Sequence, residues 1–163
     1  MMRNAVIFGG LAVALLGPTA LIIQKEALLA SGKTVLLELA PRDPRSLIQG
    51  DYMALDYAMS RQLADSVARW PRTGRLVVRR DFADVARFVR RHDDGAPLAA
   101  GEQLLVYRTR DSQLRVGSDA FHFQEGDAPR YAGARYGELR VAADGESVLV
   151  GLRDSAGRVL GER

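Results

Sequence analysis

Residues 43–57 read DPRSLIQGDYMALDY, and this stretch decides how the chain around it folds. Pro44 cannot continue a helix, and Gly50-Asp51 is a turn signal. From Tyr52 to Met59 the residues then alternate in size and polarity, which is typical of a half-buried strand. The two faces of this expected strand are Met53, Leu55, Tyr57 and Met59 on one side and Tyr52, Ala54, Asp56 and Ala58 on the other.

Further short strands are expected on both sides of this stretch, at residues 34–39, 75–80, 85–91, 103–110, 114–116, 120–124, 138–142 and 147–153. Asp144-Gly145 predicts a hairpin between the last two. Residues 81–90 also fit an amphipathic helix. Ser60 can cap a short helix over residues 61–69 that Pro71 stops, although an extended loop is an alternative, and residues 128–136 fit one or two helical turns. The fold class is therefore mostly β, a small antiparallel barrel or sandwich-like domain with one or two short helices.

An apolar segment precedes this domain. Ala5 to Ile23 contains nineteen residues without a charge, which as a helix span about 28 Å, close to the thickness of a bilayer core. We expect a transmembrane helix, prolonged over residues 24–30, and a separate domain from residue 31 to 163. The slight positive bias of Arg3 places the N-terminus in the cytoplasm and the domain in the periplasm. A signal peptide broken at Gly17-Pro18 is the alternative, but no small-x-small cleavage site follows cleanly.

Charge and composition exclude several classes of function. The net charge is +3, and many of the arginines stand beside acidic residues, whereas a nucleic-acid binder clusters its positive charge on one face. The chain has no cysteine, so disulfides, thiolate metal sites and cysteine nucleophiles are ruled out. We therefore expect no nucleic-acid partner.

The motif G-D-Y-x-x-L-x-Y at residues 50–57 resembles the signature of the GDYXXLXY family of bacterial membrane-anchored proteins, to which no biochemical activity is assigned. Two further blocks are similar to that family: LLELAPRDPR at residues 36–45, and RVGSDAFHFQEGDAPRYAGARYGELR at residues 115–140. The resemblance implies a single-span protein of the bacterial inner membrane with a periplasmic domain. It also implies a multi-pass inner-membrane protein as a possible partner, and it supplies no catalytic residue.

The residues singled out around the motif are Asp43, Arg45, Gly50, Asp51, Tyr52, Leu55 and Tyr57. A structural role is the favoured interpretation, because Asp stabilises turns through its backbone contacts and buried aromatic residues are mostly core. The alternative is a binding site for a ligand or a partner. Tyr52 and Tyr57 fall on opposite faces of the expected strand, so both cannot line one shallow pocket. Phe121, Phe123, Tyr131 and Tyr136 are core residues by default, or a partner surface if they are exposed together.

No catalytic set emerges from the sequence. The segment from Pro44 to Asp51 is similar to part of the Ser-Lys proteases, but no serine lies just before Pro44 and no lysine follows Lys33. His92 lies beside two aspartates, yet a zinc site needs three or four converging ligands, so we expect neither a metal nor a cofactor. The leading hypothesis is a membrane-anchored periplasmic domain that binds or stabilises a partner membrane protein. The alternative is a periplasmic ligand-sensing or envelope-binding domain.

Overall fold

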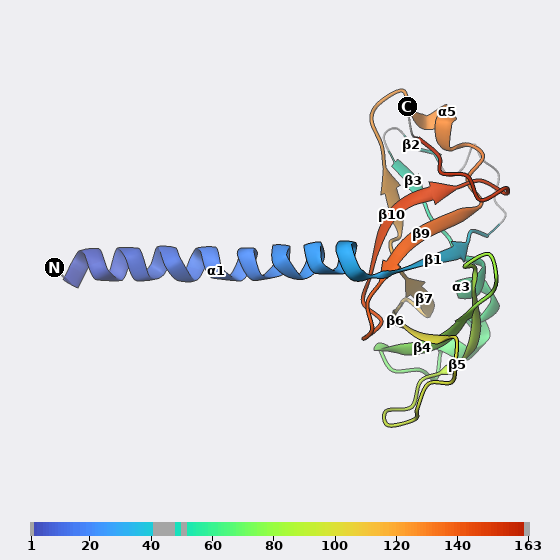
Figure 1. Cartoon of the computed structure of the whole chain (residues 1–163), viewed down its shortest axis with the longest axis horizontal. Coiled ribbons are helices and arrows are strands. Elements are labelled where there is room, and N and C mark those ends of the chain that lie inside the picture. Colours follow the sequence, from blue (N-terminus) through green and yellow to red (C-terminus); the bar gives the residue numbers. More distant parts are fainter. Residues whose placement is uncertain (1, 41–47, 50–51, 162–163) are drawn as a thin grey trace.

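The structure, a computed structural model, describes residues 2–40, 48–49 and 52–161, and among these it leaves out the side chains of residues 2–8, 11–13, 48 and 49. The chain begins with one long helix, α1 (Met2–Ser31), which projects away from a β-rich domain (Figure 1). The helix continues through residues 24–30, as predicted, and ends one residue later. Among the described side chains of α1, that of Leu28 in the last turn is buried.

The junction between α1 and the domain is closely packed around Gly32. The Gly32 N–H donates to the Leu28 carbonyl at 2.8 Å, and the Gly32 carbonyl accepts from Arg140 Nη1 at 3.3 Å. A Cβ added at Gly32 would lie 2.5 Å from the Leu28 carbonyl oxygen, so a side chain does not fit there. A glycine is therefore required where the helix passes into the first strand.

The described residues of the domain form three small antiparallel sheets. The first has the order β1-β9-β10, the second β2-β3-β8 and the third β5-β4-β6-β7. Their bounds are β1 (Lys33–Glu38), β2 (Ile48–Gln49), β3 (Tyr52–Ala54), β4 (Thr73–Arg80), β5 (Ala86–Arg91), β6 (Glu102–Arg110), β7 (Gln113–Val116), β8 (Ala120–His122), β9 (Tyr136–Val141) and β10 (Ser147–Arg153). The described part of the domain also contains three short helices: α3 (Ala58–Gln62), α4 (Ala64–Val67) and α5 (Ala128–Tyr131).

Isolated bridges join the sheets around one core. A parallel bridge between Leu36 and Val85 places β1 beside β5, so that the first and third sheets form a curved series, β10-β9-β1-β5-β4-β6-β7. A second bridge joins Leu39 to Tyr57 at the end of the motif. The side chains that this arrangement buries most completely are Tyr107, Leu37, Leu76, Leu105, Leu139 and Leu152 and a set of valines. The prediction of a mostly β, antiparallel domain with few short helices is confirmed.

The strand expected at residues 52–59 is only partly correct. Met53, Leu55, Tyr57 and Met59 are all buried and the residues between them are half-buried, as the alternation indicated. However, β3 ends at Ala54, and α3 begins at Ala58. The helix expected over residues 61–69 is also wrong in detail: Tyr57, not Ser60, occupies the N-cap, and a break at Leu63 divides the segment into α3 and α4.

The other sequence-based alternatives are resolved by the observed strands. Residues 86–91 form strand β5 and not an amphipathic helix, because every second side chain of this strand, starting at Ala86, is more deeply buried than its neighbours. Asp144-Gly145 lies in the turn between β9 and β10, as predicted, with Gly145 at φ +93°.

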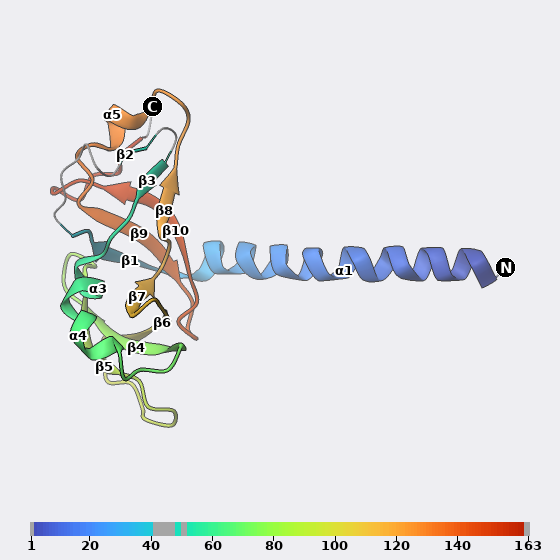
Figure 2. The same ribbon diagram turned by 180° about the vertical axis from the view of Figure 1, so that it is seen from behind.

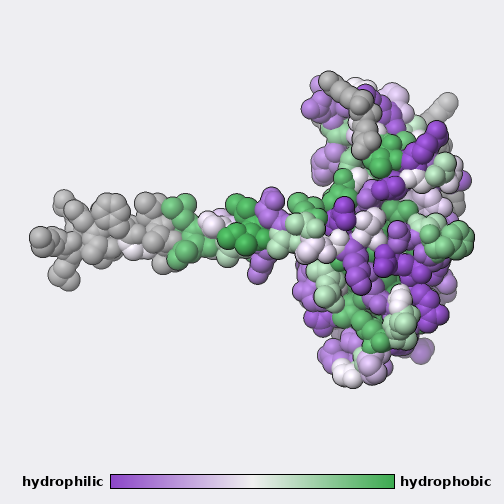
Figure 3. All heavy atoms as spheres, in the orientation of Figure 1, coloured by the Kyte–Doolittle hydropathy of each residue, from purple (hydrophilic) through white to green (hydrophobic). Residues whose placement is uncertain are grey.

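Helix α1 exposes the large apolar side chains that are described between Leu15 and Ile23, on several sides of the helix. Leu15, Leu16, Leu21, Ile22 and Ile23 are 58–67% exposed, and they follow one another around the helix at about 100° per residue. Figure 3 shows these hydrophobic side chains along the projecting helix, in contrast to the mixed and largely hydrophilic surface of the domain. Within the described residues, no helix reaches the combined length and hydropathy of a membrane span. The anchor expected at residues 5–23 remains a prediction.

Candidate functional site

The second half of the motif lines a pocket of about 450 Å³ that is open to solvent. Its walls come from the segment that follows β3, from α3 and α4, and from β7 and the turn after it. The lining residues are Ala54, Leu55, Asp56, Tyr57, Ser60, Arg61, Ala64, Gln113, Leu114, Arg115, Val116 and Asp119. We call this the motif pocket.

Tyr57 forms the closed end of the motif pocket. Its side chain is only 3% exposed, and its hydroxyl donates to the Ser118 carbonyl at 3.1 Å. The ring lies against the backbone of Gly137, where an added Cβ would come within 3.1 Å of Tyr57 Cε1. Burial is the main cause that raises the pKa of Tyr57, so the hydroxyl stays neutral and acts as a structural donor.

Two arginine–aspartate pairs occupy the open part of the motif pocket. Arg61 Nε contacts Asp56 Oδ2 at 2.8 Å, and Arg115 Nη1 contacts Asp119 Oδ1 at 3.2 Å. Arg115 also donates from Nη2 to Gln113 Oε1, while its buried Nε has no hydrogen-bond partner among the described residues. Both signs of charge are thus present in one pocket, which suits a ligand that carries an anionic and a cationic group.

The structure separates the residues that the sequence grouped around the motif. Leu55 and Tyr57 are buried in the core and line the motif pocket. Tyr52 lies on the opposite face, as predicted, with its ring centroid 5.9 Å from that of His122. The remaining residues of the group, Asp43, Arg45, Gly50 and Asp51, lie outside the described residues.

The aromatic block after β7 forms one cluster beside the β2-β3-β8 sheet. Tyr131 is buried and packs against Phe121 and Phe123, with ring centroids 5.0 and 5.2 Å away. Both phenylalanines are half-buried and pack against the core, while Tyr136 is half-buried on β9. Phe121, Phe123 and Tyr131 therefore pack in or against the core. A partner surface at these residues remains a prediction.

His92 lies at a different pocket, of about 480 Å³, which is also lined by Arg75, Arg91 and Tyr107. The two aspartates that follow His92 pair with arginines: Asp93 contacts Arg91 at 3.6 Å, and Asp94 contacts Arg75 at 3.9 Å. Asp93 and Asp94 are thus ion-pair partners of arginines.

Sequence reasoning missed the charged residues of the motif pocket. The sequence places Arg61 in a short helix or an extended loop, and it gives Arg115 and Asp119 only as part of a block that resembles the family. Arg115 and Asp119 are four residues apart, a spacing that can bring opposite charges together. This spacing was the one sign of the pair in the sequence. No sequence signal placed that pair next to residues 55–61.

Comparison with known proteins gives one result. A sequence model of the family described as GDYXXLXY protein matches residues 14–152. No curated protein and no solved structure matches the chain. The matched region includes most of α1, the described motif residues and the strands from β1 to nearly the end of β10. The chain therefore belongs to the GDYXXLXY family.

Proposed function

We propose that the chain is a single-span protein of the bacterial inner membrane whose periplasmic β domain binds or stabilises a partner membrane protein. The observation that carries the proposal is α1. The large apolar side chains described between Leu15 and Ile23 are exposed on several sides of the helix, a pattern that water does not favour and that a lipid environment does. The uncharged run from Ala5 to Ile23 has the length of a bilayer core.

The connection between helix and domain supports a function at the membrane surface. Helix α1 passes into β1 with Gly32 alone between them, and Gly32 is fixed by hydrogen bonds to both sides. An anchor joined in this way holds the domain at a short and constant distance from the bilayer. The family resemblance implies multi-pass membrane proteins as the partners that such a domain would meet.

The anchor is tested with the full chain in its native cells. We expect the protein to remain in the membrane pellet after a carbonate wash at high pH. The variant Leu16→Arg/Ile22→Arg places two charges in the apolar run, each costing about 2.5–3.5 kcal/mol in a bilayer, and should be released. The control Gln24→Arg/Ala30→Arg adds the same charge outside the run and should stay. Release of the wild type, or a mature N-terminus after residue 16, would refute the anchor.

The partner is tested by purification of the anchored chain in mild detergent. A multi-pass membrane protein should copurify in stoichiometric amount, and the same protein should be missing when the released variant is purified. Recovery of no such protein from the wild type would contradict this part of the proposal. Protease added to spheroplasts should digest the domain if it faces the periplasm, and a domain that stays protected would exclude that location.

A second candidate function is the binding of a small dipolar ligand, such as an amino acid or a short peptide, in the motif pocket. The opposed pairs Arg61–Asp56 and Arg115–Asp119 favour it, since each pair could exchange its internal contact for one with the ligand. We would measure thermal unfolding of the chain with a panel of amino acids and dipeptides. A stabilising compound should lose its effect in Arg115→Gln but not in Arg108→Gln, whose arginine lies outside the pocket. No stabilisation by any compound of the panel would count against this function.

A further inference from the structure

Two residues that line the pocket around His92 carry buried polar atoms without partners. The Tyr107 hydroxyl and His92 Nδ1 are both buried, and neither has a hydrogen-bond partner among the described residues. Both residues line the same pocket of about 480 Å³, which we call the His92 pocket. The Tyr107 side chain is 0% exposed, and its hydroxyl lies against Gly74, which also lines the pocket. Because buried polar groups are normally hydrogen-bonded, the His92 pocket suits a polar occupant.

Two arginines of the His92 pocket lie close to these atoms. Arg91, at the end of β5, directly precedes His92. Burial raises the pKa of Tyr107, and the nearby guanidinium group of Arg91 offsets part of that rise. Arg75 comes from β4, and its carbonyl accepts from the His92 N–H at 2.9 Å. Guanidinium groups and a tyrosine hydroxyl are donors that suit the oxygens of a carboxylate.

The aspartates that pair with these arginines hold them weakly. Arg91 Nη2 lies 3.6 Å from Asp93 Oδ1, and this distance is longer than a hydrogen bond. Arg75 Nη1 lies 3.9 Å from Asp94 Oδ1. The side chains of Asp93 and Asp94 are 82% and 95% exposed, so water competes for both pairs. Exposed ion pairs contribute little to stability, and a bound anion could replace them at low cost.

The turn between β9 and β10 closes one side of the His92 pocket. Arg75 Nε donates to the Asp144 carbonyl at 2.9 Å, and the Val106 N–H donates to the Gly145 carbonyl at 2.9 Å. Figures 1 and 2 show this turn beside the beginning of β4. The pocket is therefore built from three segments of the chain that contact one another directly.

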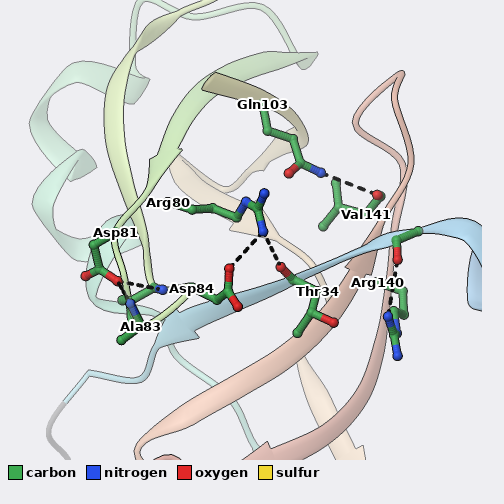
Figure 4. A network of polar contacts seen from close by, with 10 residues as sticks. Thr34, Arg80, Asp81, Ala83, Asp84, Gln103, Arg140 and Val141 are labelled. Carbon is green, nitrogen blue, oxygen red and sulfur yellow. Dashed lines mark hydrogen bonds and ion pairs between the residues drawn. The ribbon is translucent and has the colours of Figure 1, made fainter. Parts of the chain in front are cut away.

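The sheets that carry these segments are also joined by side-chain hydrogen bonds. Gln103 Nε2, on β6, donates to the Val141 carbonyl of β9 at 3.3 Å (Figure 4). Arg80 Nη1, at the end of β4, donates to the Thr34 carbonyl of β1 at 3.3 Å. The donors of the His92 pocket are thus held in place before any ligand arrives, which reduces the entropy that binding would otherwise lose.

We propose that the His92 pocket binds the carboxylate group of a small organic acid. The carboxylate oxygens accept from the guanidinium groups of Arg91 and Arg75 and from the Tyr107 hydroxyl. His92 Nδ1 adds a further donor when it carries a proton. The ligand thereby supplies the partners that the buried hydroxyl and the buried imidazole nitrogen lack.

The charge of the His92 pocket favours a monoanion over a phosphate. Its lining contains three exposed acidic residues, Asp93, Asp94 and Glu146, against two arginines. A second negative charge on the ligand would therefore add repulsion, and a phosphate carries between one and two charges near neutral pH. Pro71 and Val106 supply apolar lining for the short carbon chain of the acid.

The binding test uses the two histidines of the chain, His92 in the pocket and His122 on β8. The full chain is labelled with a nitrogen isotope, purified in mild detergent and titrated with acetate, propionate and butyrate at constant pH. Sodium chloride at matched ionic strength is the reference. We expect the imidazole NMR signals of His92 to shift and saturate and those of His122 to stay unchanged. The variant His92→Gln assigns the signals.

Variants then locate the bound acid. Arg91→Gln should weaken binding at least about tenfold, because it removes a charged donor. Tyr107→Phe should also weaken binding, and it keeps the ring, so it tests the proposal even if Arg91→Gln does not fold. The matched controls Arg108→Gln and Tyr57→Phe change residues outside the His92 pocket and should bind the acid as the wild type does. Thermal unfolding without ligand shows whether each variant is folded.

Three results would overturn the proposal. The first is the absence of a saturating shift at His92, which would leave water as the occupant of the pocket. The second is tighter binding of inorganic phosphate than of any of the acids. The third is binding that is lost in Arg115→Gln and kept in Arg91→Gln, which would place the acid in the motif pocket. The proposed membrane function is judged separately, by membrane retention and copurification, and none of these results bears on it.

Discussion

Tyr57 and Tyr107 lie in two regions of one core, and their buried hydroxyl groups differ in hydrogen bonding. Both side chains are almost fully buried, and both rings lie against the backbone of a glycine: Gly137 beside Tyr57 and Gly74 beside Tyr107. At the motif, the Tyr57 hydroxyl donates to the Ser118 carbonyl. On β6, the Tyr107 hydroxyl has no hydrogen-bond partner among the described residues, although Arg91 lies near enough to offset part of the burial that raises the pKa of Tyr107.

The two tyrosines thus differ in what their side chains contribute: Tyr107 contributes packing, and Tyr57 contributes packing and a hydrogen bond. Tyr107 fills space between Gly74 and the ring of Trp70, whose centroid lies 5.3 Å away, and a phenylalanine could do the same. Tyr57 joins the segment after β3 to the turn after β7 by its hydroxyl as well as by its ring. A tyrosine is therefore favoured over a phenylalanine at position 57, because its hydroxyl makes a structural hydrogen bond.

The largest expected effect is the loss of either ring. Tyr57→Ala and Tyr107→Ala should each lower the free energy of unfolding by about 3–5 kcal/mol, because a large cavity remains where an aromatic ring was buried. Urea denaturation of the purified chain measures this loss. Phe82→Ala is the matched control: it removes an aromatic ring of full exposure and should change the stability little. Equal losses at positions 57 and 82 would contradict the burial on which the comparison depends.

The close contact between ring and glycine should be the next largest effect. A Cβ at Gly74 would lie 2.7 Å from the Tyr107 hydroxyl oxygen and 2.8 Å from two ring carbons, so the ring would have to move. We expect Gly74→Ala to cost about 1–3 kcal/mol in urea denaturation, as overpacking does. Gly133→Ala, where nothing lies within 4 Å, should be close to neutral. A neutral Gly74→Ala would show that the β6 ring is loosely held.

Removal of the hydroxyl alone should distinguish the two regions. Tyr57→Phe leaves the Ser118 carbonyl without its donor and should cost about 0.5–1.5 kcal/mol. Tyr107→Phe removes a buried hydroxyl that has no well-formed hydrogen bond among the described residues, with Arg91 as a polar neighbour, so it should cost less than Tyr57→Phe. Both variants keep the ring, and the same denaturation experiment compares them. The comparison fails if Tyr107→Phe is the more destabilising of the two.

The sequence predicted most of the fold because its signals are local. Alternating burial from Met53 to Met59 and the Asp144-Gly145 hairpin follow from period and turn chemistry, and both are observed. The early end of β3 could not be predicted in this way, because the same four buried side chains suit a strand that passes into a helix. Burial alternates in both cases. After β3 the Asp56 carbonyl accepts from the Ala40 N–H, and a sequence pattern cannot predict such a long-range contact.

The candidate site was less predictable than the fold. Its charged side chains come from residues 56–61 and from residues 115–119, more than fifty residues apart, and only tertiary packing brings Arg61 and Arg115 to one pocket. The sequence identified Tyr57 and its orientation opposite Tyr52, since both lie on one short segment. It could not indicate that Phe82 would remain in water, because long-range contacts decide whether an apolar residue in a turn is packed.

The smallest effect concerns pH and a polar group on the same strand as Tyr107. The Glu102 carboxylate accepts from Arg90 Nη1 at 2.8 Å and from the Ala99 N–H at 3.0 Å, and these bonds, that of Arg90 first, lower its pKa. A carboxyl whose pKa is lower in the folded state stabilises the fold fully above its unfolded pKa, and this contribution is lost as the pH falls through the folded pKa. We expect Glu102→Gln to be less stable than the wild type at pH 7 and to approach it in acid. Urea midpoints measured from pH 7 downward test this, with Glu125→Gln as an exposed control. The difference in urea midpoint between Glu102→Gln and the wild type could instead stay constant with pH. That result would show that the carboxyl stabilises the β6 region by its shape and not by its charge.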